Sequence, residues 1–221
     1  MIHINGLIIV ISVYLNNHDN ENNYNTLVNC FKQLRNVYPN EKIVAIDNKS
    51  PNNKWHNIIN SLNIELLINE SDDYRYELGA YKYCLSKYSA DKYIFIQGNI
   101  YMNKQITEEL SECVPDVYLF GKLYGLYWDD NGLNLINNRL QQLNMYNWTN
   151  EDPIVLWNCF YCNDLCLKEL QKSGIFDLIC NTKYIACSNE RILGCVLFRN
   201  IIKEVKTIDR STFQKNFFGQ N

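Results

Sequence analysis

Polar residues that can bind a charged small molecule stand at the ends of three apolar segments in the first hundred residues. These segments cover residues 7–14, 42–50 and 92–99, and their polar ends contain Asp47, Asn48, Gln97 and Asn99. A carboxylate accepts hydrogen bonds from hydroxyl groups, whereas an amide both donates and accepts them. Amide oxygens also coordinate hard cations. The chemistry that these residues suit is therefore the binding of a polar ligand, with or without a cation.

The three apolar segments have the composition of β-strands buried on both faces. Each is a continuous run rich in Ile, Val or aromatic residues, as in parallel sheets covered by helices. Between the first two, Leu27, Phe31 and Leu34 recur at helical spacing, which predicts an amphipathic helix. Further elements are expected as a helix after Pro51, a strand at 64–68 and a helix over 79–88.

This β-α-β-α-β-α-β order predicts an α/β fold with a mostly parallel sheet flanked by helices. Because ligands of such sheets bind beyond the carboxyl ends of the strands, the polar ends mark a binding crevice. The later part of the chain is less regular. Its expected elements are short strands at 116–120 and 123–128, a helix at 133–143, a strand at 154–161, helices at 165–170 and 190–198, and a polar, mobile tail after Lys206. No Pro- or Gly-rich linker divides residues 1–221, so we expect a single domain.

Composition argues against two classes of partner. The net charge of −3 and the pI near 5.7 offer no basic surface for nucleic acid. The apolar run 7–13 is too short to span a membrane and follows no basic region, so we expect no membrane span and a cytoplasmic location. The nine cysteines show no paired spacing and are expected to be reduced thiols. The abundance of Asn, Ile, Lys and Tyr is typical of an AT-rich genome, such as that of some large DNA viruses.

Two common nucleotide-binding motifs are missing, namely G-x-x-x-x-G-K-[ST] and a G-x-G-x-x-G after the first strand. The polar segments that remain are Ser12–Tyr14, Asp47–Ser50, Arg75–Ala80 and Gln97–Asn99. Their order along residues 6–103 resembles the nucleotide-sugar half of a GT-A glycosyltransferase, in particular the small enzymes that build capsule-type or viral glycans. Residues 104–221 would then form the acceptor half and a tail.

The resemblance implies roles for individual residues in donor binding. Asp47 would hydrogen-bond the base or ribose, and the backbone near Val13 and Tyr14 would contact uracil. Arg75 would reach the base or the diphosphate, and Gly79 would let a helix N-terminus approach phosphate closely. The remaining members of the expected donor site are Asn48, Gln97 and Gly98. An alternative for Asp47 and Asn48 is an ordinary turn, in which both residue types are common.

The fourth strand departs from the family. GT-A enzymes usually have Asp-x-Asp there, and its last carboxylate holds a divalent metal, Mn or Mg, that neutralises the leaving diphosphate. Here the corresponding residues are Gln97 and Asn99. Asn99 would be the metal ligand, but amides contribute no charge, so metal dependence stays open unless Glu70, Asp72 or Asp73 assists.

The acceptor half contains the candidate catalytic base. Residues 156–161 and 187–194 resemble the C-terminal part of the same enzymes, and Glu190 is the first candidate, with Asp129 and Asp130 as competitors. An alternative for Glu190 is a helix-starting residue favoured by the macrodipole. The tryptophans at 128, 148 and 157 either stack on sugar rings or belong to the core.

The resemblance implies a hexosyltransferase that uses a nucleoside diphosphate sugar, UDP-linked, and a glycan hydroxyl. One alternative is a catalytically silent nucleotide- or sugar-binding domain, consistent with amides where acids are expected. A second is a nucleotidyltransferase, although that class normally has a Gly-rich loop after the first strand. The sugar, the acceptor, the stereochemistry and the oligomeric state are left open.

Overall fold

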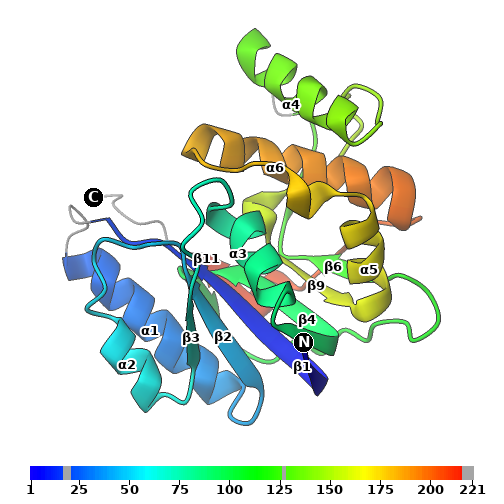
Figure 1. Cartoon of the computed structure of the whole chain (residues 1–221). Helices are drawn as coiled ribbons and strands as arrows, with labels where there is room; N and C mark the ends of the chain where they lie inside the picture. Colours follow the sequence, from blue (N-terminus) through cyan, green and yellow to red (C-terminus); the bar gives the residue numbers. More distant parts are fainter. Residues whose placement is uncertain (17–20, 126–127, 216–221) are drawn as a thin grey trace.

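The computed structural model describes residues 1–16, 21–125 and 128–215, and Figure 1 shows the arrangement of its elements. In its first half, strands alternate with helices as β1 (Ile2–Val13), α1 (Glu21–Val37), β2 (Lys42–Asp47), α2 (His56–Ser61), β3 (Glu65–Ile68), α3 (Tyr76–Leu85) and β4 (Tyr88–Gln97). This order confirms the predicted β-α-β-α-β-α-β succession.

The second half contains shorter strands and three longer helices. The strands are β5 (Ile100–Met102), β6 (Val117–Leu119), β7 (Lys122–Leu123), β8 (Ile154–Val155), β9 (Phe160–Asn163), β10 (Lys206–Thr207) and β11 (Phe213–Lys215). The helices are α4 (Asp130–Gln142), α5 (Asp164–Lys172) and α6 (Lys183–Val196). Short 3-10 turns lie at Leu156–Asn158, Ile175–Asp177 and Arg210–Thr212, and a π-turn at Leu197–Ile201 extends α6.

A seven-stranded sheet in the order β10-β6-β9-β4-β1-β2-β3 forms the centre of the molecule. β1 pairs in parallel with both β2 and β4, and β2 pairs in parallel with β3. β9 runs antiparallel between β4 and β6, which makes the sheet mixed at that side. The predicted α/β class with a mostly parallel, helix-flanked sheet is therefore confirmed.

Alternating side chains of the central strands form two hydrophobic cores, one on each face of the sheet. Ile9 and Ile11 of β1 pack with residues of α1 and α2. Ile8 and Val10, on the opposite face, pack with residues of α3, α5 and α6. Figure 1 shows α4 outside α6, as the helix farthest from the sheet. The continuous apolar runs of the strands follow from this two-sided burial.

Several element boundaries differ from the sequence expectations. The last helix begins at Lys183 rather than at Glu190, with Thr182 as its N-cap, whose side chain accepts a hydrogen bond from the backbone NH of Ile185. The helix expected over 79–88 is α3, which ends at Leu85 because β4 begins at Tyr88. Of the strand expected at 123–128, only its start belongs to β7, and residues 126–127 lie outside the described part.

The strand expected at 154–161 is interrupted by a turn. Trp157 and Asn158 have φ values of 61° and 53°, in the left-handed region, so the extended backbone cannot continue through them. The prediction of a mobile tail after Lys206 is wrong for residues up to 215. β10 extends the sheet beside β6, and β11 pairs with β5, because Phe213 packs against Phe120 at a ring-centroid distance of 4.9 Å.

Within the described residues, no helix has the length and hydropathy needed to cross a lipid bilayer. All nine cysteines are free thiols.

Candidate functional site

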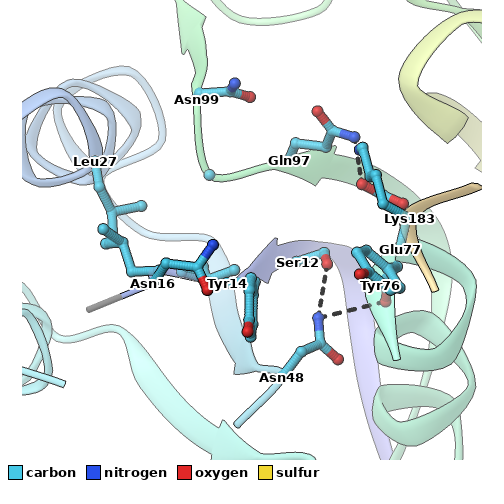
Figure 2. A pocket seen from close by; sticks show the side chains of 13 residues that line it. Ser12, Tyr14, Asn16, Leu27, Asn48, Tyr76, Glu77, Gln97, Asn99 and Lys183 are labelled. Atoms are coloured by element: carbon cyan, nitrogen blue, oxygen red, sulfur yellow. Dashed lines mark hydrogen bonds between the residues drawn. The ribbon is translucent and has the colours of Figure 1, made fainter. Parts of the chain in front are cut away.

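A cavity of about 270 Å³ lies at the carboxyl ends of β1 and β4 (Figure 2). The sheet register places these ends together, since Ser12 is opposite Gln97 across the β1–β4 pair. Val13, Tyr14, Asn48, Gln97, Gly98 and Asn99, all expected from the sequence, line this cavity together with Tyr76, Glu77 and Lys183. Parallel strand ends thus form the crevice that the sequence predicted.

Asn48 forms the buried floor of the cavity. Its amide nitrogen donates to the Ser12 hydroxyl oxygen at 3.0 Å and to the Tyr76 carbonyl oxygen at 3.4 Å. Its amide oxygen accepts from Asn69 at 3.0 Å. Asn48 and Asn69 are only 1% and 2% exposed. Because these bonds occupy both ends of the Asn48 amide, the residue holds the ends of β1, β2 and α3 in a fixed relation.

Asp47 lies behind this floor and does not line the cavity. One carboxylate oxygen accepts from the backbone NH of Ser50 at 2.8 Å, and the other is 2.7 Å from Nε2 of His56. The side chain is therefore engaged in the turn after β2, which is the alternative that the sequence left open. A contact between Asp47 and a nucleotide stays a prediction.

Arg75 and Gly79 also lie outside the cavity lining. The Arg75 guanidinium donates to Asp72, which also accepts from Lys49 at 3.0 Å, so contact with a ligand would require this ion pair to open. A Cβ atom on Gly79 would lie 2.3 Å from the carbonyl carbon and oxygen of Tyr74. The glycine is explained by this close approach of α3 to the chain before it.

A cluster of two lysines and one carboxylate surrounds the amides at the end of β4. The Gln97 amide nitrogen donates to Glu77, and its oxygen accepts from the Lys215 ammonium. The same ammonium donates to the Asn99 amide oxygen at 2.6 Å. Lys183, the first residue of α6, lines the cavity beside Glu77 (Figure 2). Sequence reasoning missed Glu77, Lys183 and Lys215.

The two lysines differ in how their surroundings affect the charge. Burial lowers the pKa of Lys215, and the neighbouring Cys159 and Glu77 oppose this only in part. Burial also disfavours the charge of Lys183, but Glu77 and other acidic groups outweigh it, so the pKa of Lys183 is raised. The Lys215 ammonium also lies 5.3 Å from the ring centroid of Trp157, which favours a cation there.

Glu190 lies near this cluster in the middle of α6 and not at the start of a helix. The macrodipole explanation is therefore wrong, since that effect is confined to the first turn. One carboxylate oxygen of Glu190 accepts from the backbone NH of Trp157 at 2.9 Å. Burial raises the pKa of Glu190 to about 7, with a smaller contribution from Glu77 in the same direction. A carboxylate with this pKa suits proton transfer near neutral pH.

The competing carboxylates lie elsewhere. Asp129 is the N-cap of α4, where it accepts from the backbone NH of Gly132 at 2.7 Å and from the Tyr184 hydroxyl at 3.3 Å. Asp130 is the exposed first residue of the same helix. Neither residue lines the cavity, and α4 is separated from the sheet by α6 (Figure 1).

The tryptophans have different surroundings. The Trp128 ring packs against Gly132 and lies 4.4 Å from the Arg191 guanidinium, whereas Trp148 packs against the core on the α6 face of the sheet. Trp157, in contrast, lies beside Lys215 and Glu190. Of the three residues, Trp157 is therefore the one that belongs to the site.

The residues at the end of β4 do not fit a divalent metal. Both amide oxygens in question, of Gln97 and Asn99, accept hydrogen bonds from the Lys215 ammonium, and a cation already between them excludes a second one by repulsion. Of the acids expected to assist, Asp72 is paired with Lys49 and Arg75. Within the described ranges, no three residues among His, Cys, Asp and Glu form a group that could hold a metal ion.

Comparisons with known proteins give one distant structural similarity. No protein-family model matches the chain, and no curated protein matches it. A crystal structure of the galactosyltransferase LgtC with donor and acceptor sugar analogues is similar over 83% of this chain and 70% of that one, at 11% identity and a TM-score of 0.39. A similarity this distant carries no argument about the reaction, which has to come from the side chains of the site.

Proposed function

We propose that the protein is a glycosyltransferase that moves a hexose from a UDP-linked donor to a glycan hydroxyl. The observation that supports this most is the grouping of two lysines and the near-neutral carboxyl of Glu190 around a cavity at the carboxyl ends of parallel strands. Cations suit a diphosphate leaving group, and a carboxylate suits a hydroxyl that must lose its proton. The resemblance of residues 6–103 to the nucleotide-sugar half of GT-A enzymes agrees with this assignment.

In the proposed reaction the bond between C1 of the sugar and the diphosphate oxygen breaks, and its electron pair stays on the diphosphate. A new bond forms between C1 and the acceptor oxygen, whose proton passes to the Glu190 carboxylate. Lys183, which lines the cavity, stabilises the negative charge that develops on the leaving group. Val13, Tyr14 and Asn48 form the wall on which the nucleoside would rest.

A catalytically silent nucleotide- or sugar-binding domain is the second candidate. The observation that favours it is the amide pair Gln97 and Asn99 where GT-A enzymes usually have acids. Such a domain would retain the cavity and bind the donor, but would not break the bond to the sugar.

One experiment separates these candidates. The protein is incubated with UDP-hexoses and a panel of glycans, and both released UDP and the extended glycan are measured. A transferase releases UDP in step with glycan extension, and Glu190→Gln slows this at least about a hundredfold. Donor binding in calorimetry without release of UDP would instead identify a binding domain.

A further inference from the structure

We propose that the Lys215 ammonium, held by the amide oxygens of Gln97 and Asn99, takes the place of the divalent metal and binds the donor diphosphate directly. This inference rests on the proposed function, because it assigns a ligand within the same site. It also explains why amides stand where GT-A enzymes have acids.

The geometry around Lys215 suits an ammonium better than a metal ion. Its Nζ lies 2.6 Å from the Asn99 amide oxygen and donates also to the Gln97 amide oxygen. The amide of Gln97 is oriented by Glu77, which accepts from its nitrogen, so the oxygen is directed at Lys215. Three side chains thus fix the position of one positive charge at the end of β4.

Neutral amides hold this cation without neutralising it. A carboxylate at position 97 or 99 would form an ion pair with Lys215 and weaken its attraction for an anion. Among the residues that the structure describes, no carboxylate lies within 4.0 Å of the Lys215 or Lys183 ammonium. Gln97 and Asn99 therefore orient a charge that is still available to a ligand.

Lys183 supplies a second positive charge to the same space. It lines the cavity from the side of α6, while Lys215 is held by two residues that line it from the side of β4. The two ammonium groups are close enough to affect each other electrostatically. Converging like charges are unfavourable in the empty protein, but they match a ligand group that carries two or more negative charges. A diphosphate has this chemistry.

The inference is tested by measuring binding of UDP and of uridine by calorimetry, in chelator and in millimolar Mn²⁺. The wild-type protein should bind UDP with an affinity that changes less than about twofold between the two buffers. Lys215→Met should lower UDP affinity about tenfold or more, as expected for losing a charged hydrogen-bond donor, and leave uridine affinity unchanged. Lys168→Met, which removes a lysine paired with Asp164 on α5, is the matched control and should bind like wild type.

A second variant keeps the test valid if Lys215→Met does not fold. Asn99→Asp retains Lys215 but pairs it with a carboxylate, so UDP affinity in chelator should again fall while uridine affinity holds. In the double variant Asn99→Asp with Lys215→Met, Mn²⁺ should restore UDP binding, because the ammonium no longer excludes a metal from the new carboxylate.

Two results would overturn the inference: a wild-type protein that binds UDP only with Mn²⁺, or a folded Lys215→Met variant that binds UDP like wild type in chelator. Absence of UDP and uridine binding in both buffers would overturn the proposed function as well. Lysine-dependent UDP binding without glycan extension would refute the transferase alone and leave the role of Lys215 in place.

Discussion

At the scale of single residues, burial determines what Glu190 can do. Its carboxyl group is mostly enclosed beside the Trp157 backbone, which raises its pKa to about 7. As a base it must be ionised, so turnover should rise as the pH increases through about 7. Glu190→Gln should remove this rise, because an amide does not titrate. A pH profile of kcat for both proteins checks the assignment, and a rise that persists in the Gln variant would exclude Glu190 as the base.

The same pKa has a consequence for stability. Because the folded pKa of Glu190 is raised above the ordinary value of 4.5, ionisation opposes folding, and the stabilisation present at low pH is lost as the pH rises to about 7. Glu190→Gln can still accept the bond from Trp157. It should therefore raise the free energy of unfolding at pH 8 by about 2–3 kcal/mol relative to wild type, and change it little at pH 4. Urea unfolding at the two pH values measures the difference.

Asp47 allows a direct comparison of its two interpretations. Its carboxylate bonds to Ser50 and His56, so Asp47→Ala should lower the free energy of unfolding by about 1–3 kcal/mol. His56→Ala removes only one of these bonds and should have a smaller effect. If Asp47→Ala instead leaves unfolding unchanged and weakens UDP binding, the carboxylate contacts the nucleotide and not the turn.

At the scale of elements, α3 carries two cavity residues, Tyr76 and Glu77, at a position set by Gly79. Gly79→Ala places a Cβ against the Tyr74 carbonyl, so the helix has to shift. We expect a loss of about 1–3 kcal/mol in unfolding free energy, larger than the helix-propensity gain of about 1 kcal/mol from Gly to Ala. If Gly79 instead serves phosphate approach, the Ala variant keeps its stability and loses only affinity for UDP.

The elements of the first half could be predicted because each carries its own signal. The runs at residues 7–14, 42–50 and 92–99 are long, apolar and separated by helical periodicity, and two-sided burial produces that pattern in any parallel sheet. β10 and β11 have no such signal. They contain two and three residues, and their positions follow from pairing with β6 and β5, which lie far away in the sequence.

The candidate site could be predicted only in part for the same reason. Residues that follow strands, such as Val13, Asn48 and Gln97, are recognisable because strand ends meet at one edge of the sheet. Lys215 is not recognisable, because nothing local distinguishes it from a solvated lysine in a polar segment. Its role arises from tertiary contacts with Gln97 and Asn99, more than a hundred residues earlier.

At the scale of the whole molecule, the segment that carries Lys215 is anchored by one aromatic residue. Phe213 is 8% exposed and packs against Phe120 and Trp157. Phe213→Ala should destabilise the protein by about 3 kcal/mol and also weaken UDP binding, because β11 loses its anchor and Lys215 its fixed position. Unfolding and calorimetry measure the two effects. Unchanged UDP affinity would mean that Lys215 is positioned independently of Phe213.

The position of β1 and β4 inside the sheet also sets the rates at which backbone protons leave the molecule. Both strands have hydrogen-bonded neighbours on each side, so their amides are released only when the whole sheet separates. α4 is covered only by α6 and its surroundings, so it can open while the sheet stays intact (Figure 1). Deuterium from solvent should therefore enter α4 first and reach β1 and β4 last. Ligand-protected amides at the ends of these two strands would then appear against a background of almost no exchange.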